Sequence, residues 1–496
     1  MSKRSFVSVY RTVSAALLVA VTGSVLLLGC TSEKSVARVF GGFGSGPVSS
    51  LDGTPDFDRF RKAFISSTVD DGTREQQLKH FSDAFLRVRR DYVHEVNQPE
   101  LLSAAISGID QARGAEKSIT PVSATEAALD TLLASLDPHS GYLNPDEFRE
   151  SQVVTSGQFG GLGIEINAEN GLIKVIAPIA DTPAERAGIK AGDLITHVDG
   201  ENIQGLQLND AVKRLRGAPR TNVVLHIRRE GVAEFDVTVT RAIIQIEPVK
   251  WAIEGDYGII RVTTFISRSE EALGRAMRRI RSDVGANLKG IVLDLRDNPG
   301  GLLTQSVAVA DAFLNDGKFV SVRDREGEMR RFDASPGDMA RGLPMVVLIN
   351  RGSASASEIV AGALQDQHRA TVFGVRSFGK GSVQTITPLD WDGALRLTTA
   401  LYYLPSGRTI QGRGVLPDIG VTGPEEKDAR READLPHAIT AAEALDDARS
   451  RASLDESSCP TAGAKKDDRL LGCALMFLKA GSQEKFLASM AQRPKS

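Results

Sequence analysis

The chain has 496 residues, 41% of them hydrophobic and 25% charged, which is enough for two or three domains with cores of their own. Its formal net charge of −3 gives no basic excess of the kind that binds nucleic acid, so nucleic acid is not an expected partner. The sequence has no Walker-type phosphate loop and no zinc-like His/Cys spacing, and we therefore expect no nucleotide, metal or other cofactor.

The N-terminus has the pattern of a bacterial export signal. Basic residues at positions 3, 4 and 11 precede an apolar run over 15–28, and the Gly-Cys pair ending at Cys30 resembles the lipoprotein box, in which the cysteine becomes the lipidated first residue. We expect residues 1–29 to be a signal peptide, and the protein to be lipid-anchored in the bacterial periplasm or cell envelope. Cleavage by the ordinary signal peptidase and retention of the run as a membrane anchor stay open as alternatives.

The use of cysteine agrees with export. If Cys30 carries lipid, Cys459 and Cys473 remain as an even pair in an oxidising compartment. A disulfide between them would close one C-terminal loop. The alternative is that Cys473 is simply a buried residue of its helix.

Two stretches of different composition follow the signal. Residues 30–55 are rich in glycine and serine and predict a flexible tether. Residues 56–150 predict a helical region, because phenylalanines at 60, 64, 81 and 85 recur at helical spacing. A further helix is expected over 124–133, and Pro138 then marks the loop that follows it.

The segment 156–242 resembles a PDZ domain. Its most specific part is Pro-Ala-Glu-Arg-Ala-Gly-Ile-Lys-Ala-Gly-Asp-Leu-Ile at 183–195, and a Gly-Gly-Leu-Gly turn enters an alternating strand. Successive N–H groups of such a turn can hold a chain-terminal carboxylate while the peptide adds as a strand along the domain edge. The resemblance implies that Leu162, Gly163 and Ile164 supply this cradle. It also suggests that Arg216, at the end of the domain's helix, links peptide occupancy to the active site.

From residue 248 onward, apolar strands alternate with helical patterns. Strands are expected at 258–262, 290–295, 344–350 and 395–404, with helices at 270–281 and 358–366. This alternation predicts an α/β core with crossover connections over 248–422. The rest, 423–496, is expected to be a helical extension with a charge-rich, solvated stretch at 425–432 and a packing helix at 467–478.

A serine-rich turn connects the strand at 344–350 with the helix at 358–366. It reads Arg-Gly-Ser-Ala-Ser-Ala-Ser-Glu, and it places hydroxyls where backbone N–H groups converge and the helix dipole favours negative charge. Such a turn suits a nucleophile whose product is an oxyanion, and an ordinary junction capped by serine is the alternative.

Farther on, Lys380 lies between two glycines. If it is buried, desolvation lowers its pKa and leaves a neutral amine that can act as a general base, oriented by Gln384. The alternative is an exposed lysine in a hairpin.

Together, the serine-rich turn and the Phe-Gly-Lys-Gly-Ser-Val-Gln run at 378–384 resemble the C-terminal processing peptidases, also called tail-specific proteases. The resemblance implies Ser355 as nucleophile and Lys380 as base, because this pair has the family's separation (380 − 355 = 25). Ser353 and Ser357 do not have it. The resemblance also implies that Gln384 assists the lysine, and that Asp366, after the nucleophile helix, plays a supporting role.

Two further stretches match this family. Asp-Leu-Arg-Asp-Asn-Pro-Gly-Gly at 294–301 implies an oxyanion hole made by the N–H groups of Ala356 and of Gly301, with Gly300 as the alternative. Asp-Pro-His-Ser at 137–140 also matches, and the family gives His139 no catalytic role. A Ser-His-Asp triad is therefore not expected, and His139 is interpreted as structural.

The sequence thus predicts an α/β multidomain protein with an N-terminal helical segment, an inserted PDZ domain and an α/β (crotonase-like) peptidase core. The expected function is an exported serine endopeptidase that recognises the free, apolar C-terminus of protein substrates. Other expected partners are a second copy through the N-terminal helices, an adaptor or activator protein, and the membrane through the lipid. Two other classes stay open: a catalytically silent PDZ scaffold, and an acyl-substrate enzyme on a related core.

Overall fold

The computed structural model describes residues 53–169, 171–390, 393–423, 430–440, 452–464 and 466–492. The expected signal peptide, Cys30 and nearly all of the expected tether lie outside these residues. Within the described ranges, no helix combines the length and the apolar composition needed to cross a bilayer.

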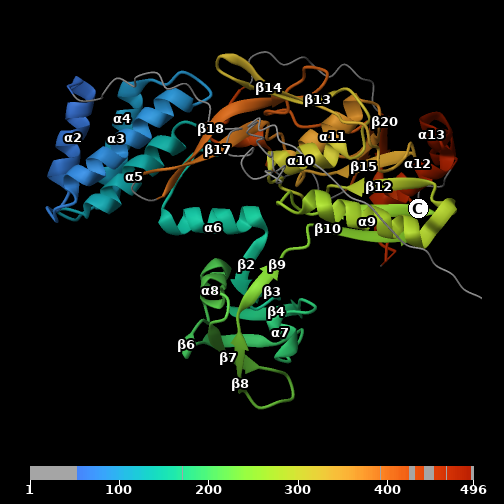
Figure 1. Cartoon of the computed structure of the whole chain (residues 1–496), viewed down its shortest axis with the longest axis horizontal. Helices are drawn as coiled ribbons and strands as arrows, with labels where there is room; N and C mark the ends of the chain where they lie inside the picture. Colours follow the sequence, from blue (N-terminus) through green and yellow to red (C-terminus); the bar gives the residue numbers. More distant parts are fainter. Residues whose placement is uncertain are drawn as a thin grey trace, which may run out of the picture. The chain divides into compact units, whose positions relative to one another are not determined.

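The N-terminal region is a packed group of helices (Figure 1). They are α2 (Pro55–Ser67), α3 (Arg74–Asp91), α4 (Gln98–Arg113) and α5 (Pro121–Ala134). Phe60, Phe64, Phe81 and Phe85 are fully buried between them, and the rings of Phe60 and Phe81 stack with centroids 4.0 Å apart. The helical spacing of these phenylalanines is therefore explained by one shared core.

The segment predicted to be a PDZ domain forms a small sheet with two helices. Its strands run in the order β3-β4-β5-β7-β8, and β6 pairs with β5. The bounds are β3 (Ile164–Glu169), β4 (Leu172–Pro178), β5 (Leu194–Val198), β6 (Glu201–Asn202), β7 (Asn222–Arg228), β8 (Phe235–Thr240), α7 (Pro183–Arg186) and α8 (Leu208–Leu215). Among the described residues β3 pairs only with β4, so its other edge is open to an added strand.

Short elements connect this unit to the rest of the chain. α6 (Pro145–Ser156) precedes it, and the side chain of Asn144 caps α6 by accepting from the N–H groups of Asp146 and Glu147. After α6, β2 (Gln158–Gly161) pairs antiparallel with β9 (Ala242–Gln245). The chain therefore enters and leaves the unit through one two-stranded ribbon.

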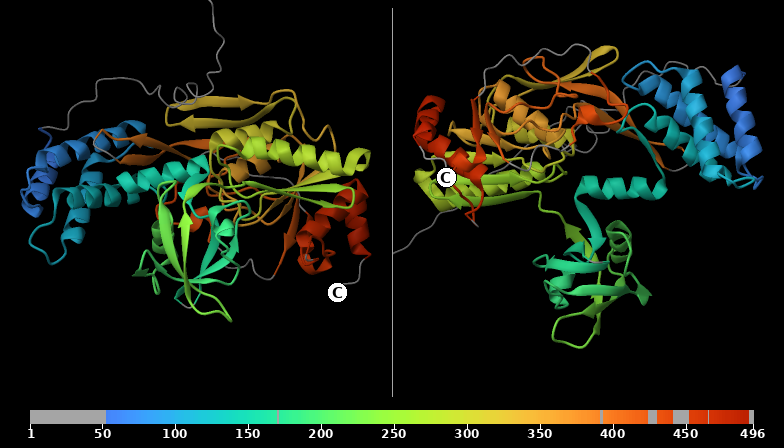
Figure 2. Two further views of the ribbon diagram at one scale, coloured as in Figure 1. Left: turned by 60° about the horizontal axis from the view of Figure 1, so that its bottom comes forward. Right: turned by 180° about the vertical axis from the view of Figure 1, so that it is seen from behind.

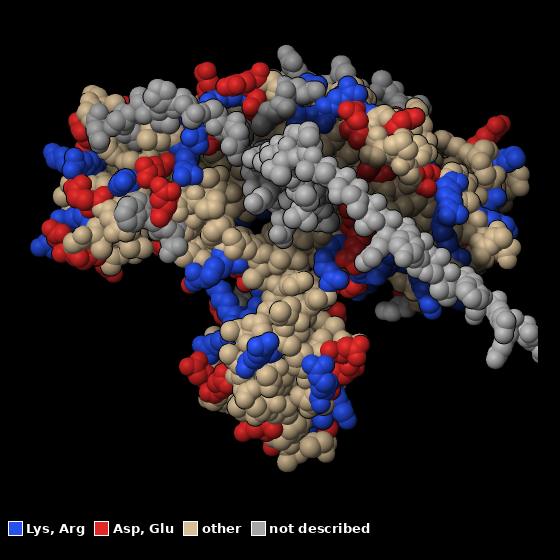
Figure 3. Space-filling model, viewed as in Figure 1, with Lys and Arg blue, Asp and Glu red and all other residues tan. Residues whose placement is uncertain are grey.

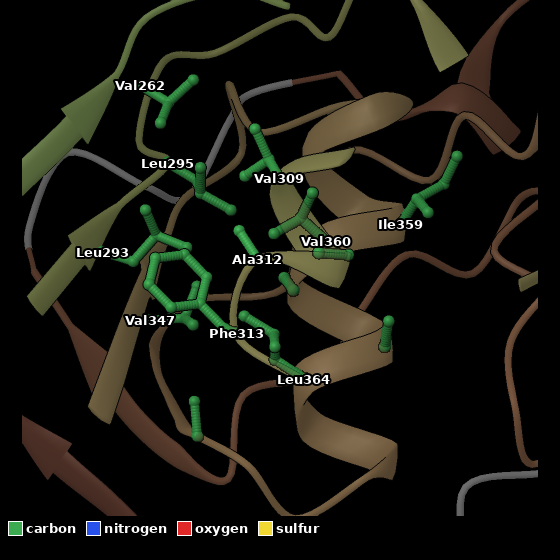
Figure 4. Close-up of a cluster of buried hydrophobic side chains, with 14 of the residues drawn as sticks. Val262, Leu293, Leu295, Val309, Ala312, Phe313, Val347, Ile359, Val360 and Leu364 are labelled. Carbon is green, nitrogen blue, oxygen red and sulfur yellow. The ribbon is translucent and has the colours of Figure 1, made fainter. Parts of the chain in front are cut away.

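The core is built on a sheet of order β10-β11-β12-β15-β16-β19-β20, parallel except between β10 and β11. The bounds are β10 (Val249–Glu254), β11 (Tyr257–Val262), β12 (Gly290–Asp294), β15 (Met345–Ile349), β16 (Thr371–Gly374), β19 (Ile419–Thr422), β20 (Ala452–Asp455), α9 (Ser269–Val284), η1 (Gly285–Asn287), α10 (Leu303–Asp311) and α11 (Ala356–Asp366). α9, α10 and α11 cover one face, where Leu293 and Val347 of the strands cluster with Val360 and Leu364 of α11 (Figure 4). Parallel strands with crossover helices confirm the expected α/β core.

The parallel pairing of β12 and β15 determines where the candidate site lies. Asp294, the last residue of β12, is in register with Leu348 near the end of β15. The loops that follow the two strands therefore leave the sheet side by side, at its carboxyl edge. These loops contain the glycine pair at 300–301 and the serine-rich turn.

A second sheet joins the core to the N-terminal helices. β18 (Ala394–Tyr403) lies between β1 (Gly141–Leu143) and β13 (Lys318–Asp324); β14 (Gly327–Asp333) pairs with β13, and β17 (Ser382–Pro388) with β18. Leu395, Leu397 and Leu401 of β18 are buried in the same cluster as the N-terminal phenylalanines. Figure 2 shows these orange strands reaching the blue helices.

The prediction that residues 423–496 form a helical extension was wrong in one respect, because this segment also contains a strand. β20 pairs in parallel with β19 and adds an edge strand to the core sheet. α12 (Arg469–Ala480) and α13 (Gln483–Ala491) cover the second face of the sheet, where Phe477 and Phe486 contact Phe373 of β16. Cys459 and Cys473 form a disulfide with an S–S distance of 2.06 Å, next to the start of α12.

Candidate active site

Ser355 occupies the turn between β15 and α11. Its backbone has φ 55° and ψ −113°, a positive-φ conformation that costs a non-glycine residue on the order of 1–3 kcal/mol. It immediately precedes the first residue of α11, so the N–H groups at the start of that helix lie beside it. The residue is 9% exposed. A strained and largely shielded serine at a helix N-terminus is a position at which a nucleophile is expected.

The two neighbouring serines have structural partners instead. The hydroxyl of Ser353 donates to the carbonyl oxygen of Leu295 at 2.8 Å, and that of Ser357 donates to the carbonyl oxygen of Asn298 at 2.8 Å. Both serines are fully buried. They fasten the serine-rich turn to the loop after β12, which leaves Ser355 as the serine of this run that is available for chemistry.

Lys380 lies in the turn just before β17. Burial lowers the pKa of its amine below the ordinary lysine value of 10.5, which favours the neutral base. The carboxylates of Glu432, Asp137 and Glu358 oppose this shift. Arg396 adds to it. Among the described residues no hydrogen bond joins the amine to the Ser355 hydroxyl, as is often the case before substrate binds.

A buried carboxylate joins the serine and lysine turns. Glu358, in the first turn of α11, uses one oxygen, Oε2, to accept the N–H of Ser355 at 2.7 Å and the N–H of Lys380 at 2.9 Å. Its Oε1 accepts from the Ser377 hydroxyl at 2.6 Å and the Gly379 N–H at 2.7 Å. Burial raises the pKa of Glu358 to about 7, and these four hydrogen bonds limit the rise.

Sequence reasoning gave Glu358 no role. The available signal was a glutamate three residues after a serine at the start of a helix, a pattern that also occurs in ordinary helix capping. What the sequence does not show is that the same carboxylate reaches a turn 19 to 22 residues later.

Gly301 and Ala356 have backbone N–H groups that are free to bind an oxyanion. Among the described residues neither N–H donates to an acceptor, whereas the N–H of Gly300 donates to Asn298 Oδ1 at 2.9 Å. Gly300 lies against the serine turn, because a Cβ added to it would come within 2.9 Å of Ser355 Cβ. Of the two glycines, Gly301 is therefore the available donor.

Gly301→Ala is expected to lower kcat about 100-fold or more, with a smaller effect on KM, because an oxyanion donor acts mainly in the transition state. At φ 138°, a Cβ on residue 301 would lie 2.1 Å from the carbonyl oxygen of Phe265, so the loop must move. Steady-state kinetics measures the effect. The matched control is Gly285→Ala, a positive-φ glycine with open space around it, which should cost stability only. A kcat for Gly301→Ala within threefold of the parent's would show that this loop is not the oxyanion site.

Gln384 lies on β17 but points into a different network from the one predicted. Its amide donates to Ser382 Oγ and to Thr398 Oγ1, both at 3.0 Å. Thr398 in turn donates to Asp137 at 3.0 Å. In the described structure no hydrogen bond connects Gln384 to Lys380. Its contribution would be to order the strands that carry the lysine turn.

Asp366 lies at the end of α11 opposite to Ser355, so the structure does not bring it to the serine. Its carboxylate accepts from Arg408 at 2.5 Å and from the N–H and hydroxyl of Ser406 at 3.1 and 2.6 Å. It therefore holds the turn at 405–408 against the far end of the nucleophile helix. Any support it gives to catalysis is indirect.

The glycine turn of the PDZ-like unit has the expected free donors. Among the described residues, the N–H groups of Leu162 and Gly163 donate to no acceptor. Their carbonyl oxygens are held by Ala184 N–H and Ile179 N–H, at 2.9 and 2.8 Å, which fixes the turn. Ile164, the third predicted cradle residue, is the first residue of the open-edged β3. Successive free N–H groups beside an unpaired strand edge suit a peptide carboxylate.

Arg216 lies at the end of α8 and reaches out of the PDZ-like unit. It pairs with Glu150 of α6, and its guanidinium lies 4.6 Å from the centre of the Phe159 ring on β2. Arg216 therefore contacts both of the elements through which the chain enters this unit. Among the described residues no hydrogen bond or ion pair joins Arg216 to the serine or lysine turn.

The described residues offer no arrangement for a metal ion, since no group of three or more His, Cys, Asp and Glu is suitably placed among them. Acidic and basic side chains are interspersed over the face shown in Figure 3.

Comparison with known proteins identifies the family. A model of peptidase family S41 matches residues 256–421, and a PDZ domain model matches residues 174–229. A carboxy-terminal-processing protease of Bartonella bacilliformis is 49% identical over 352 residues, which are 70% of this chain and 76% of that protein. A probable CtpA-like serine protease of Staphylococcus aureus is 36% identical over 304 residues, 61% of this chain and 60% of that protein. The solved structure of a photosystem II D1 C-terminal processing protease has 30% identity and a TM-score of 0.44, over 70% of this chain and 92% of its own.

An α/β peptidase core that carries a PDZ domain defines the class, a serine-type peptidase. The chain belongs to peptidase family S41, with the carboxy-terminal-processing proteases.

Proposed function

We propose that this protein is a serine endopeptidase in which Ser355 is the nucleophile and Lys380 the general base. The observation that carries the proposal is the single oxygen of Glu358 that accepts from the backbone N–H of both residues. This carboxylate brings together two turns that are far apart in the chain. The burial that lowers the pKa of Lys380 supplies the neutral amine that a base requires.

In the first half of the reaction, the Lys380 amine takes the proton of the Ser355 hydroxyl while Oγ bonds to the scissile carbonyl carbon. The carbonyl π electrons move to its oxygen, and the N–H groups of Gly301 and Ala356 bind the resulting oxyanion. When the C–N bond breaks, the Lys380 ammonium gives its proton to the leaving amine. An ester to Ser355 remains.

In the second half, water attacks the ester carbon and Lys380 accepts a proton from it. The oxyanion forms again in the same place and collapses with loss of the Ser355 oxygen, which recovers its proton from Lys380. The acyl part leaves as a carboxylic acid. Each turn of the cycle therefore consumes one water and returns the serine and the lysine to their starting forms.

We further propose that the PDZ domain selects the substrate by its free C-terminus. The free N–H groups of Leu162 and Gly163 would bind the terminal carboxylate, and the substrate chain would pair with β3. Ile164 and Ile166 of β3 are only partly buried against the apolar core of the domain, and the apolar surface that they leave exposed favours an apolar tail. The contacts of Arg216 with α6 and β2 offer a route by which peptide binding could influence the peptidase core.

Export and lipid attachment at Cys30 are also part of the proposal. The sequence pattern before Cys30 supports them, and the disulfide between Cys459 and Cys473 fits an oxidising compartment. Pairing of two copies through the N-terminal helices, and an adaptor or activator protein, remain proposals that the sequence resemblance alone supports.

Amidation of the substrate's C-terminus tests the role of the PDZ domain. With the full chain and an unfolded substrate that ends in apolar residues, we expect kcat/KM to fall about tenfold or more when the terminal carboxylate is amidated, because charge-assisted hydrogen bonds are lost. The two substrates differ in no other respect. Equal cleavage of both would contradict tail recognition. Binding of the free-ended substrate without cleavage would instead indicate a scaffold.

A further inference from the structure

A second buried carboxylate lies beside the lysine turn and comes from a part of the chain that the S41 model does not match. Glu432 begins η3 (Glu432–Asp434), beyond the matched residues 256–421. It was expected to lie in a solvated, charge-rich stretch. Instead its exposure is 0%. A fully buried glutamate outside the core requires partners that balance the cost of its desolvation.

The partners of Glu432 come from two other regions. His139 Nε2 lies 2.9 Å from Oε1 and 2.8 Å from Oε2 of Glu432, and Gln411 Nε2 donates to Oε1 at 3.0 Å. His139 belongs to the loop after α5, next to Asp137, which accepts from the N–H of residue 139 at 2.8 Å. The N-terminal helical region, the core and the C-terminal segment therefore meet at one carboxylate.

This meeting point holds the lysine turn on both sides of Lys380. The N–H of Glu432 donates to the carbonyl oxygen of Phe378 at 3.1 Å. The N–H of Gly381 donates to Gln411 Oε1 at 2.9 Å, and the other end of the Gln411 amide holds Glu432. Glu432 therefore holds Phe378, two residues before the lysine, directly, and Gly381, one residue after it, through Gln411.

We propose that Glu432 is a positioning residue for Lys380: held by His139 and Gln411, it fixes the lysine turn and places a negative charge beside the amine. The inference rests on the proposed function, since it assigns a role toward the proposed base. It also explains why His139 and Gln411, from different parts of the chain, are both directed at Glu432. Docking of the C-terminal segment then becomes a condition for activity.

The charges that face Lys380 determine the sign of the effect. They are Glu432, Asp137 and Glu358, which raise the pKa of the amine, and Arg396, which lowers it. Burial lowers the pKa more than any of them changes it. Because a negative neighbour favours the ammonium form, removing the charge of residue 432 makes the amine easier to deprotonate. The neutral base then persists to lower pH.

The test is the pH dependence of kcat/KM for the full chain and for Glu432→Gln, with an internally quenched peptide that has a free apolar C-terminus. We expect the midpoint of the acid limb to move down by about half a pH unit or more in Glu432→Gln, together with a lower plateau. The matched control is Asp434→Asn, which removes the same charge from an exposed position of the same turn. It should leave the acid limb in place. An equal shift in both variants, or none in Glu432→Gln, would overturn the proposal.

Glu432→Asp keeps the proposal testable if the glutamine variant does not fold. It retains the charge but draws it back by one methylene, so we expect the parent's acid limb, a kcat at least about fivefold lower and little change in KM, because the residue does not contact substrate. A kcat equal to the parent's would contradict the positioning role.

If the parent cleaves through Ser355 but these variants behave like it, the inference fails and the proposed function stands. If Ser355→Ala cleaves as fast as the parent, the proposed function fails first.

Discussion

Lys380→Met is expected to lower kcat/KM by about 10³-fold or more, because it removes the only group proposed to accept the Ser355 proton. Methionine has a similar length and is apolar, so it suits the buried site and removes the cost of placing an amine there. Initial rates on the free-ended substrate measure the effect. Lys250→Met, at an exposed position of β10, is the control and should retain the parent's rate.

The pH profile connects this loss with the proposed mechanism. Since burial depresses the pKa of Lys380, activity should rise with pH through a midpoint below the ordinary lysine value of 10.5. Between 10.5 and that lower pKa the unfolded chain binds a proton that the folded chain does not, so the free energy of unfolding decreases as pH falls across this window and levels off below it. In Lys380→Met, both the rise of activity with pH and the change in the free energy of unfolding should be absent. If the residual activity of this variant kept the parent's pH dependence, that dependence would belong to another group.

Ser355→Ala is expected to reduce cleavage by about 10⁴-fold or more, because no acyl-enzyme can form without the hydroxyl. Alanine keeps the backbone N–H that donates to Glu358, so the variant is expected to fold. Ser353→Ala and Ser357→Ala are the matched controls in the same turn. Each removes one hydrogen bond to the loop after β12 and should lower the free energy of unfolding by about 1–2 kcal/mol. Their kcat values should stay far above that of Ser355→Ala.

Local patterns were sufficient to predict most of the fold. The spacing of Phe60, Phe64, Phe81 and Phe85 reflects packing within one cluster, and the apolar run at 344–350 became β15, whose five residues are all buried. Both patterns involve residues that are close together in the sequence. A helix buried on one face repeats apolar residues at helical spacing, and a strand buried on both faces is a continuous apolar run. β20 was missed because four residues paired only at the edge of a sheet carry too short a pattern.

The positions of Ser355, Lys380 and Gly301 could be suggested from motifs, but the residues that hold them together could not. Glu358 and Glu432 act across long separations, and their burial depends on partners that only the folded chain supplies. A charge-rich stretch around Glu432 predicts solvent exposure when it is read alone, since glutamate is rarely buried without a partner. Here His139, nearly three hundred residues earlier, is that partner. For the same reason, Gln384 was assigned to the lysine, although its amide is taken by Ser382 and Thr398.

The most direct test of the account is the mass-spectrometric detection of fragments after long incubation of an unfolded, apolar-ended substrate with Ser355→Ala and with the parent. The account predicts internal cleavage products from the parent and none from Ser355→Ala, even when the parent has consumed all of its substrate. The same fragments from both proteins, at comparable rates, would show that Ser355 is not the nucleophile.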